Sequence, residues 1–209
     1  GVRVELVVRR SDSRSDEECL SFFGLVPHPN LHLRRVRTIG RVGFLLSSLS
    51  LLARNWDYVY TRDLLLADLC IKVSSVPVVF EAHTVASSFA AERQNLYSRG
   101  QPASASKLKR LDARECRVFN NASGIVTITK ALFEELQNSY GIAKKHIVAP
   151  DGCHISEQSP SPIQGNKIYY IGQLYPWKGV DVLVQAMQYV KDAELVVVGG
   201  FVEEPDLTR

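Results

Sequence analysis

The last third of the chain places glycines and a lysine where strands end, a pattern that suits the binding of an anionic group. An apolar run, KIYYI, ends at a glycine, and a loop with Lys178 leads into a helical pattern from about Val180. A lysine and backbone N–H groups at a helix N-terminus attract anions. A second run, ELVVV, ends at two glycines that let a ligand approach the backbone. The glycines are Gly172, Gly179, Gly199 and Gly200. They predict a phosphate-binding half-domain; a solvated, ligand-free Lys178 is the alternative.

These residues need a parallel sheet to position them, and strand-like and helix-like segments alternate along the whole chain. VPVVFEA and SGIVTIT are almost continuously apolar, which is typical of parallel strands buried on both faces. The predicted strands are Val2–Val8, His32–Val36, Tyr58–Tyr60, Val76–Phe80, Gly124–Ile128, His146–Ala149, 167–172 and 193–200. The predicted helices are Ile39–Arg54, Asp63–Val73, Val85–Ser98, Ser104–Asn121, Lys130–Tyr140 and Val180–Val190. This order predicts an α/β fold with βα units around a parallel sheet.

The segment Ile155–Asn166 predicts a division of the chain into two domains. It contains two prolines, three serines and a glycine without an extended apolar run, a composition that fits an interdomain linker. We therefore predict a Rossmann-like domain over residues 1–154 and the first βαβ unit of a second Rossmann-like domain over residues 167–209. Roughly forty residues cannot bury a stable core alone. Because Gly1 rather than Met opens the chain, we expect a piece of a larger protein.

Composition is that of a globular protein and narrows the range of partners. Of 209 residues, 45% are hydrophobic and 22% are charged, which excludes a disordered tail, a collagen-like repeat and a coiled coil. The net charge of +3 is too small for a dedicated nucleic-acid binder, and no apolar run approaches the roughly 20 residues of a membrane span. The cysteines are Cys19, Cys70, Cys116 and Cys153. Their wide spacing predicts reduced thiols in a cytoplasmic protein.

Five motifs in the family's order resemble the retaining glycosyltransferases of family 4. They are FEAHTV, RECRVFNNASGIVTITKALFEELQNSYGI, HIVAPDGCHI, the glycine and lysine loop in IYYIGQLYPWKGV, and the strand that ends in VVVGG. The resemblance covers most of the chain from about Trp56 onward. It implies the GT-B fold and the transfer of a sugar from a nucleoside-diphosphate donor with retention of configuration. It also implies that no cofactor or metal ion is needed.

The resemblance implies roles for individual residues. His83 would contact the donor sugar near the reacting carbon and is the candidate catalytic residue; a structural histidine at a strand end is the alternative. Lys178 would stabilise the negative charge on the leaving diphosphate, as preorganised donors do. The donor-binding candidates are Gly172, Gln173, Lys178, Gly179, Gly199 and Gly200.

Four further residues are candidates for the cleft. Glu81 lies two positions before His83, on the same side of an extended strand, and would either orient the imidazole or pair with a neighbouring base. Arg62 follows the strand in YVYTRD and would meet an anionic donor or acceptor; an ordinary surface arginine explains it equally well. Asp151 and Gly152 occupy the turn that the family places facing the cleft.

Three departures from the family pattern bear on activity. Gln173 stands where many relatives have an arginine that shares the diphosphate with the lysine. The family's two glutamates, eight positions apart, would fall beyond Arg209, and its glycine-rich first loop would fall before Gly1. We therefore expect the 209 residues to be inactive without the rest of the parent enzyme.

Two alternative functions and one surface stay open. A non-catalytic nucleotide-sugar-binding or scaffold relative would explain Gln173, and a nucleotide-sugar epimerase would share the GT-B cleft. Between Gly24 and Trp56 there are five arginines and no acids, namely Arg34, Arg35, Arg37, Arg41 and Arg54. This region would dock on anionic lipid or form the solvated basic edge of a core helix. The expected setting is polysaccharide biosynthesis in the cytoplasm or at the inner face of the membrane, with a sugar or lipid-linked acceptor.

Overall fold

The computed structural model describes residues 1–10, 13–36, 40–97, 103–142, 145–152, 165–175 and 178–200, apart from the side chains of residues 40, 41, 53 and 93–97. It contains two compact units. The first unit comprises residues 1–83 and 116–149, and the second comprises residues 84–115 and 150–209. The long helix α5 (Ala105–Asn121) contributes residues to both units.

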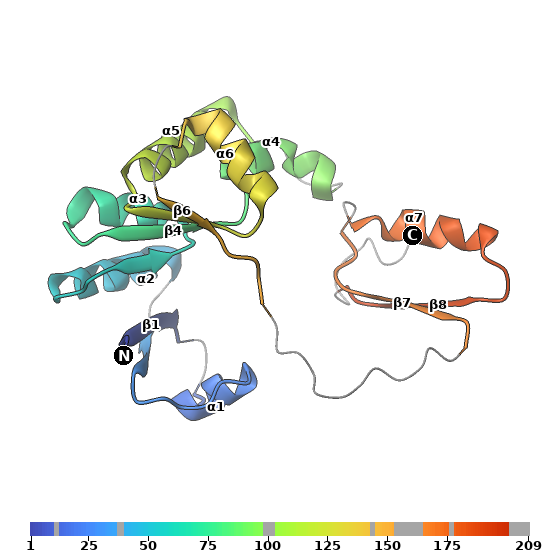
Figure 1. The fold of residues 1–209 in the computed structure, drawn as a ribbon, viewed down its shortest axis with the longest axis horizontal. Coiled ribbons are helices and arrows are strands. Elements are labelled where there is room, and N and C mark those ends of the chain that lie inside the picture. Colours follow the sequence, from blue (N-terminus) through green and yellow to red (C-terminus); the bar gives the residue numbers. More distant parts are fainter. Residues whose placement is uncertain are drawn as a thin grey trace. The chain divides into compact units, whose positions relative to one another are not determined.

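Parallel strands form two sheets in the first unit (Figure 1). Strands β1 (Val4–Arg9) and β2 (Leu31–Val36) pair with each other. The larger sheet has the order β3-β4-β5-β6, and its neighbouring strands are parallel. Its strands are β3 (Val59–Thr61), β4 (Val78–Ala82), β5 (Gly124–Thr127) and β6 (His146–Val148). Their carboxyl ends therefore lie at one edge of the sheet.

Helices connect the strands, as expected for βα units. In the first unit they are α1 (Asp16–Phe22), α2 (Gly40–Ser50), the short 3₁₀ helix η1 (Leu51–Ala53), α3 (Leu64–Val73) and α6 (Lys130–Tyr140). Helix α6 begins where the Thr129 hydroxyl accepts a hydrogen bond from the Leu132 N–H at 3.1 Å, and it ends at Gly141, which has a φ of 64°. These are the residue types that favour a helix start and a left-handed helix end.

The core of the first unit lies beneath β4 and β5. Alternate residues of β4 are buried, and Phe80 from this strand meets Phe119 of α5 with ring centroids 5.8 Å apart. On β5, Ile125 is buried, as is Thr127, whose Oγ1 has no hydrogen-bond partner in the described part of the chain.

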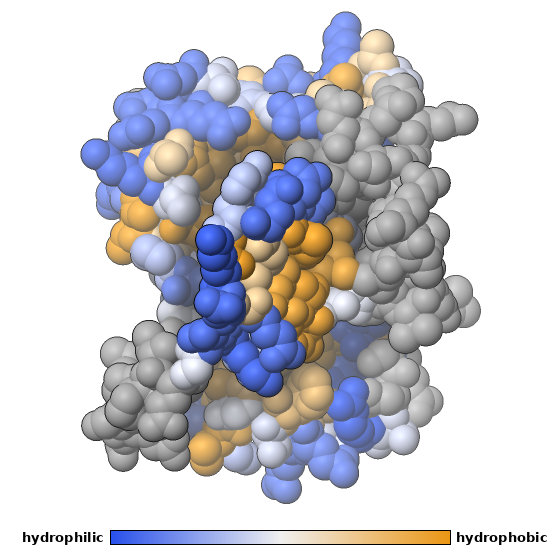
Figure 2. Space-filling model, turned by 90° about the vertical axis from the view of Figure 1, so that its right-hand side faces the viewer, coloured by the Kyte–Doolittle hydropathy of each residue, from blue (hydrophilic) through white to orange (hydrophobic). Residues whose placement is uncertain are grey.

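The second unit contains a parallel pair of strands, β7 (Lys167–Ile171) and β8 (Glu194–Val198). Between them lie α7 (Val180–Ala186) and the 3₁₀ helix η3 (Met187–Tyr189), and α4 (Ala86–Tyr97) also belongs to this unit. Several apolar side chains of the unit are exposed. They include Tyr169, Ile171, Val182, Val184, Tyr189 and Val198. Figure 2, in which the right-hand side of Figure 1 faces the viewer, shows hydrophobic surface.

The structure confirms the predicted α/β class and the parallel pairing of the strands. Each predicted strand and helix has an observed counterpart, with ends that differ by a few residues. Helix α1 was not predicted. Residues 155–164 of the proposed linker Ile155–Asn166 lie outside the described residues, as does Cys153. Cys19, Cys70 and Cys116 are free thiols, and burial raises the pKa of Cys70 to about 11.

Candidate functional site

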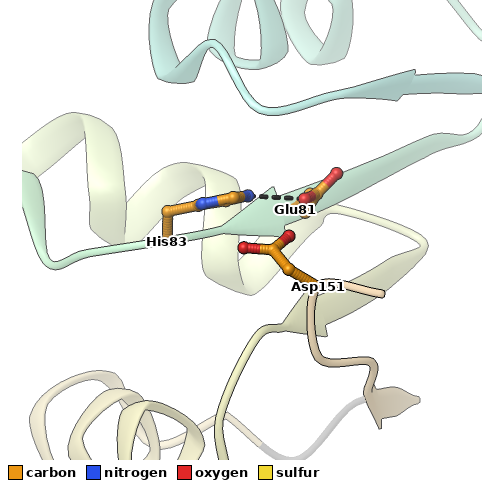
Figure 3. Close-up of side chains that lie close together, drawn as sticks. All are labelled: Glu81, His83 and Asp151. Atoms are coloured by element: carbon orange, nitrogen blue, oxygen red, sulfur yellow. Dashed lines mark hydrogen bonds and ion pairs between the residues drawn. The ribbon is translucent and has the colours of Figure 1, made fainter. Parts of the chain in front are cut away.

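Glu81 and His83 form a hydrogen-bonded pair at the carboxyl end of β4. Figure 3 shows the imidazole of His83 pointing along the strand toward the carboxylate of Glu81, and His83 Nε2 lies 2.5 Å from Glu81 Oε1. The side chains are 30% and 20% exposed, respectively. The alternation of an extended strand brings residues 81 and 83 to the same side. The pair is therefore partly shielded from water while the ring remains accessible to a ligand.

Two residues of the neighbouring chain segment act on Glu81. Tyr60 on β3 and Arg62 both lower the pKa of this carboxyl group, Tyr60 through its phenol hydroxyl and Arg62 through its positive charge. Tyr60 has the largest effect on this pKa; the hydrogen bond with His83 lowers it further, and both outweigh the opposing effect of burial. Glu81 is therefore an anion at neutral pH.

The same contact changes the phenol of Tyr60. Loss of water around its hydroxyl, followed by the hydrogen bond and the negative charge of Glu81, raises the Tyr60 pKa to about 12. Tyr60 therefore stays protonated at physiological pH and serves as a donor. Sequence reasoning missed Tyr60, because its proximity to Glu81 depends on the register between β3 and β4.

A buried carboxylate fixes the start of α4 in the second unit. Glu115 on α5 is 1% exposed, and its two oxygens accept hydrogen bonds from the backbone N–H groups of Ala86 at 2.5 Å and Ser87 at 3.0 Å. These donors have no partner within the helix itself, because they belong to its first turn. Glu115 therefore acts as an N-terminal cap contributed by another helix.

The glycines that end β7 and β8 are packed backbone against backbone. A Cβ atom at Gly199 would lie 1.6 Å from the carbonyl oxygen of Gly172, and Gly172 N–H donates to the carbonyl of Val198 at 3.0 Å. Gly200 has a φ of 83°, which favours glycine. The structure thus brings Gly172 and Gly199 together, and close strand packing requires that Gly199 have no side chain.

The loop after β7 carries Gln173 and Lys178. The Gln173 carbonyl accepts a hydrogen bond from the Tyr170 hydroxyl at 2.6 Å, and its side-chain Oε1 is buried without a partner among the described residues. Lys178 is exposed, and its N–H donates to the carbonyl of Tyr175 at 2.9 Å. Gly179, with a φ of 66°, precedes α7, whose first turn receives no side-chain cap at this residue. A lysine thus stands directly before the N-terminus of α7.

Asp151 and Gly152 are the remaining candidates. Both are exposed and follow the end of β6 by three and four residues. They belong to the second unit together with Lys178, whereas Arg62, Glu81 and His83 belong to the first.

Three of the five arginines in the candidate membrane region have acidic partners in the first unit. Arg34 and Arg54 pair with Glu5, whose side chain is 5% exposed, and Arg35 pairs with Asp16 at 3.7 Å. Arg37 and the side chain of Arg41 lie outside the described residues. Charges neutralised within the fold attract anionic lipid less strongly, so these pairs favour a structural role for the three arginines. No described helix is long and apolar enough to cross a bilayer.

The comparison with known families covers the part of the chain that holds the Glu81–His83 pair. The model for Glycosyltransferase Family 4 matches residues 1–156. The match includes the first 55 residues, where the resemblance is weak, and it ends before the glycine and lysine loop. No curated protein matched the chain. Because the family match covers about three quarters of the 209 residues, the chain belongs to glycosyltransferase family 4.

Proposed function

We propose that this protein transfers a sugar from a nucleoside-diphosphate donor to an acceptor with retention of configuration. The observation that carries the proposal is the Glu81–His83 pair at the carboxyl end of β4, within the segment matched to the family. Ligands of open parallel sheets bind at the carboxyl ends of strands. The proposal keeps the predicted domains, with an acceptor-side domain over residues 1–154 and a donor-side domain from residue 167.

In this proposal His83 contacts the donor sugar near the carbon that reacts. A neutral imidazole can form a hydrogen bond there without bringing a net charge into the site. Glu81 orients the ring through the contact at Nε2. A fixed ring costs less entropy when the sugar binds than a freely rotating one.

Lys178 stabilises the departing diphosphate in the same proposal. Negative charge grows on the leaving group as the bond to the sugar breaks, and a preorganised cation lowers the energy of that state. The exposed Lys178, directly before the start of α7, has the charge and the freedom to do so. The buried amide oxygen of Gln173, in the same loop, has no hydrogen-bond partner among the described residues. No step in this scheme requires a metal ion.

The proposal is tested with the protein expressed as its gene encodes it and a panel of UDP-, GDP- and ADP-sugars. We expect release of one nucleoside diphosphate and a product with the donor's anomeric configuration. His83→Gln and Lys178→Ala should each lower kcat/KM about 100-fold or more, by analogy with the loss of one preorganised donor.

Matched controls separate these roles from general damage. His146 opens β6 at the opposite edge of the same sheet, stacked 3.5 Å from the ring of Phe133, and Lys191 is exposed after η3. His146→Gln and Lys191→Ala should leave kcat/KM within about twofold of the unsubstituted protein.

Gln173 favours a second candidate, a non-catalytic nucleotide-sugar-binding protein, because a neutral amide supplies no charge to a leaving group. Calorimetric binding of one nucleotide sugar without turnover would replace the enzyme proposal with this candidate. Neither binding nor turnover with any donor would contradict both.

A further inference from the structure

A pocket with a volume of about 420 Å³ lies between α1 and the start of β2 in the first unit. Residues of α1, residues 27–29 and residues 31–33 line it. Its volume is within the range of small-molecule sites, roughly 300–1,000 Å³. We propose that this pocket binds an uncharged saccharide. That the saccharide is part of the acceptor rests on the proposed function, whereas the binding itself does not.

The start of α1 is fixed by a capping box. The Ser15 hydroxyl accepts a hydrogen bond from the Glu18 N–H at 3.1 Å, and the Glu18 carboxylate accepts one from the Ser15 N–H at 2.6 Å. Asp16 and Glu17 in the first turn, and Leu20 one turn after Asp16, then line the pocket. Leu20 is only 7% exposed. Helix α1 therefore supplies two carboxylates and a buried apolar side chain.

The segment before β2 forms the other side of the pocket. Pro27 and Pro29 restrict the backbone on both sides of His28. The His28 ring accepts a hydrogen bond at Nδ1 from the Asn30 N–H at 3.1 Å, and the His28 carbonyl accepts one from the Leu31 N–H at 2.9 Å. Because the ring and the backbone are held before a ligand arrives, binding costs less entropy.

These contacts decide what the polar side chains offer to a ligand. Because Nδ1 of His28 accepts a hydrogen bond, the neutral ring carries its hydrogen atom at Nε2 and can donate there. The ionised carboxylates of Asp16 and Glu17 only accept hydrogen bonds. A sugar hydroxyl both donates and accepts, so one polyhydroxylated ring can satisfy both kinds of group. Leu20 and Leu31 offer apolar surface to the C–H face of such a ring.

The same residues argue against an ion as the ligand. In the part of the chain that the structure describes, no three ligating atoms from the acids and histidines of this pocket lie within 4.8 Å of one another, as a metal ion would need. A phosphate would meet two carboxylates. Asp16 pairs with Arg35 at 3.7 Å, but Glu17 has no ion-pair or hydrogen-bond partner among the described residues. The uncompensated charge of Glu17 therefore disfavours an anion.

The position of the pocket bears on what the saccharide is for. Residues 31–33, which line the pocket, are the first half of β2. Ligands of open parallel sheets bind at the carboxyl ends of strands, and the Glu81–His83 pair lies at such an end, on β4. A saccharide at the amino end of β2 is thus recognised without reacting there. Within the proposed function it is a remote sugar unit of the acceptor.

The first test is a titration of the ¹⁵N-labelled protein, expressed as its gene encodes it, with glucose, galactose, mannose, N-acetylglucosamine, maltose and lactose. We expect at least one of these sugars to bind saturably with a Kd of about 10 mM or tighter. The amide shift changes should be concentrated in residues 16–20 and 27–33. Absence of saturable binding for all six sugars, or shift changes that lie elsewhere, would overturn the proposal.

Two substitutions test the polar groups of the pocket. Glu17→Ala and His28→Gln should each weaken sugar binding about threefold to tenfold, the effect of one lost hydrogen bond. The controls are Glu135→Ala, at an exposed acid of α6, and His146→Gln; both should change the Kd less than about twofold. Equal losses in variants and controls would show that the sugar does not use this pocket. If His28→Gln fails to fold, the exposed Glu17 decides the test.

Competition identifies the class of ligand. Inorganic phosphate and Zn²⁺, added separately, should neither shift the amides of residues 16–20 and 27–33 nor displace a bound sugar. If either ion shifts these amides while no sugar does, the pocket is an ion site and the saccharide proposal is wrong.

Kinetics decide whether the saccharide belongs to the acceptor. Glu17→Ala should raise KM for a saccharide acceptor about threefold to tenfold and should change KM for the donor less, while Glu135→Ala changes neither. An unchanged acceptor KM in a variant that has lost sugar binding would mean that the pocket binds a free saccharide, which overturns the acceptor assignment. If the unsubstituted protein binds sugars as expected but turns over no nucleotide sugar, the proposed function fails and the saccharide pocket stands.

Discussion

Asp68 on α3 accepts two hydrogen bonds from Arg117 on α5, from Nε to Oδ1 at 2.9 Å and from Nη2 to Oδ2 at 3.1 Å. Lys72 adds a third contact, from Nζ to Oδ2 at 2.9 Å. The carboxylate is almost fully buried, whereas the Arg117 and Lys72 side chains are about half exposed. One buried anion thus joins two helices through residues that are 49 positions apart in the chain.

Replacement of this anion should weaken the first unit. Asp68→Asn keeps the shape of the side chain but removes its charge, so we expect the free energy of unfolding to fall by about 2 kcal/mol, in the range of hydrogen bonds to charged groups. Urea unfolding at pH 7 measures the change. Lys130→Ala, which removes a solvent-exposed pair with Glu134, should cost less than about 0.5 kcal/mol. Equal losses from both variants would contradict the assignment.

The same carboxylate predicts a dependence of stability on pH. Burial alone would raise the pKa of Asp68, but hydrogen bonds from Arg117 and Lys72 outweigh burial and lower it from 3.8 to about 2. A lowered pKa contributes stability above the pKa of the unfolded chain, and the contribution disappears as the pH falls through the folded value. We expect a loss of about 2 kcal/mol between pH 5 and pH 2 from this group.

Unfolding measured from pH 7 down to pH 2 checks this expectation. Asp68→Asn should show a shallower decline than the unsubstituted protein, with the remaining slope due in part to Glu5 and Glu81, whose pKa values are also lowered. Parallel pH curves for the two proteins would show that Asp68 titrates without such partners.

Glu115 should be sensitive even to the loss of its charge alone. In Glu115→Gln the amide oxygen can replace one acceptor, but the amide NH₂ faces the second backbone N–H, so we expect a loss of about 1–3 kcal/mol. Hydrogen exchange of the Ala86 and Ser87 amides should accelerate more than that of amides in α6. Glu18→Gln, in the exposed capping box of α1, is the control and should change stability by less than about 0.5 kcal/mol.

Sequence patterns predicted the elements whose signals are local. The apolar runs of β4 and β5 predicted buried strands, and the helix predicted over Lys130–Tyr140 has the same bounds as α6. Helix α1 was missed because its apolar periodicity is weak. Its available signal was chemical, since Ser15 and Glu18 have the spacing of a capping box, which the structure contains.

In the candidate site, too, the sequence predicted the contacts between residues close in the chain and missed those between different elements. Glu81 lies in β4 and His83 follows the last residue of that strand, so the alternation of an extended chain predicts that the two side chains lie on the same side. Tyr60 and Glu115 could not be found in this way, because their contacts depend on strand register and on the packing of α5. A residue's partner in another element depends on tertiary structure, and a single sequence gives no direct record of it.

Gly141 gives a test of backbone conformation without a change in packing. Its φ is 64°, and a Cβ atom there would meet no atom within 4 Å. Gly141→Ala should therefore cost about 1 kcal/mol through backbone strain alone. Gly124→Ala, at a residue of ordinary φ where the nearest contact would be 3.8 Å, should be neutral or slightly stabilising. Thermal unfolding compares them, and a larger cost at Gly124 would contradict this account.

The contact between Gly199 and Gly172 affects how any survey of variants should be interpreted. Since a methyl group at residue 199 would overlap the backbone of residue 172, every substitution at residue 199 must displace a strand before any ligand is considered. Inactivity of a Gly199 variant is therefore no evidence that the glycine touches a nucleotide. If relatives always have glycine at this position, the close packing of the two strands is enough to explain it, and the glycine gives no information about the substrate.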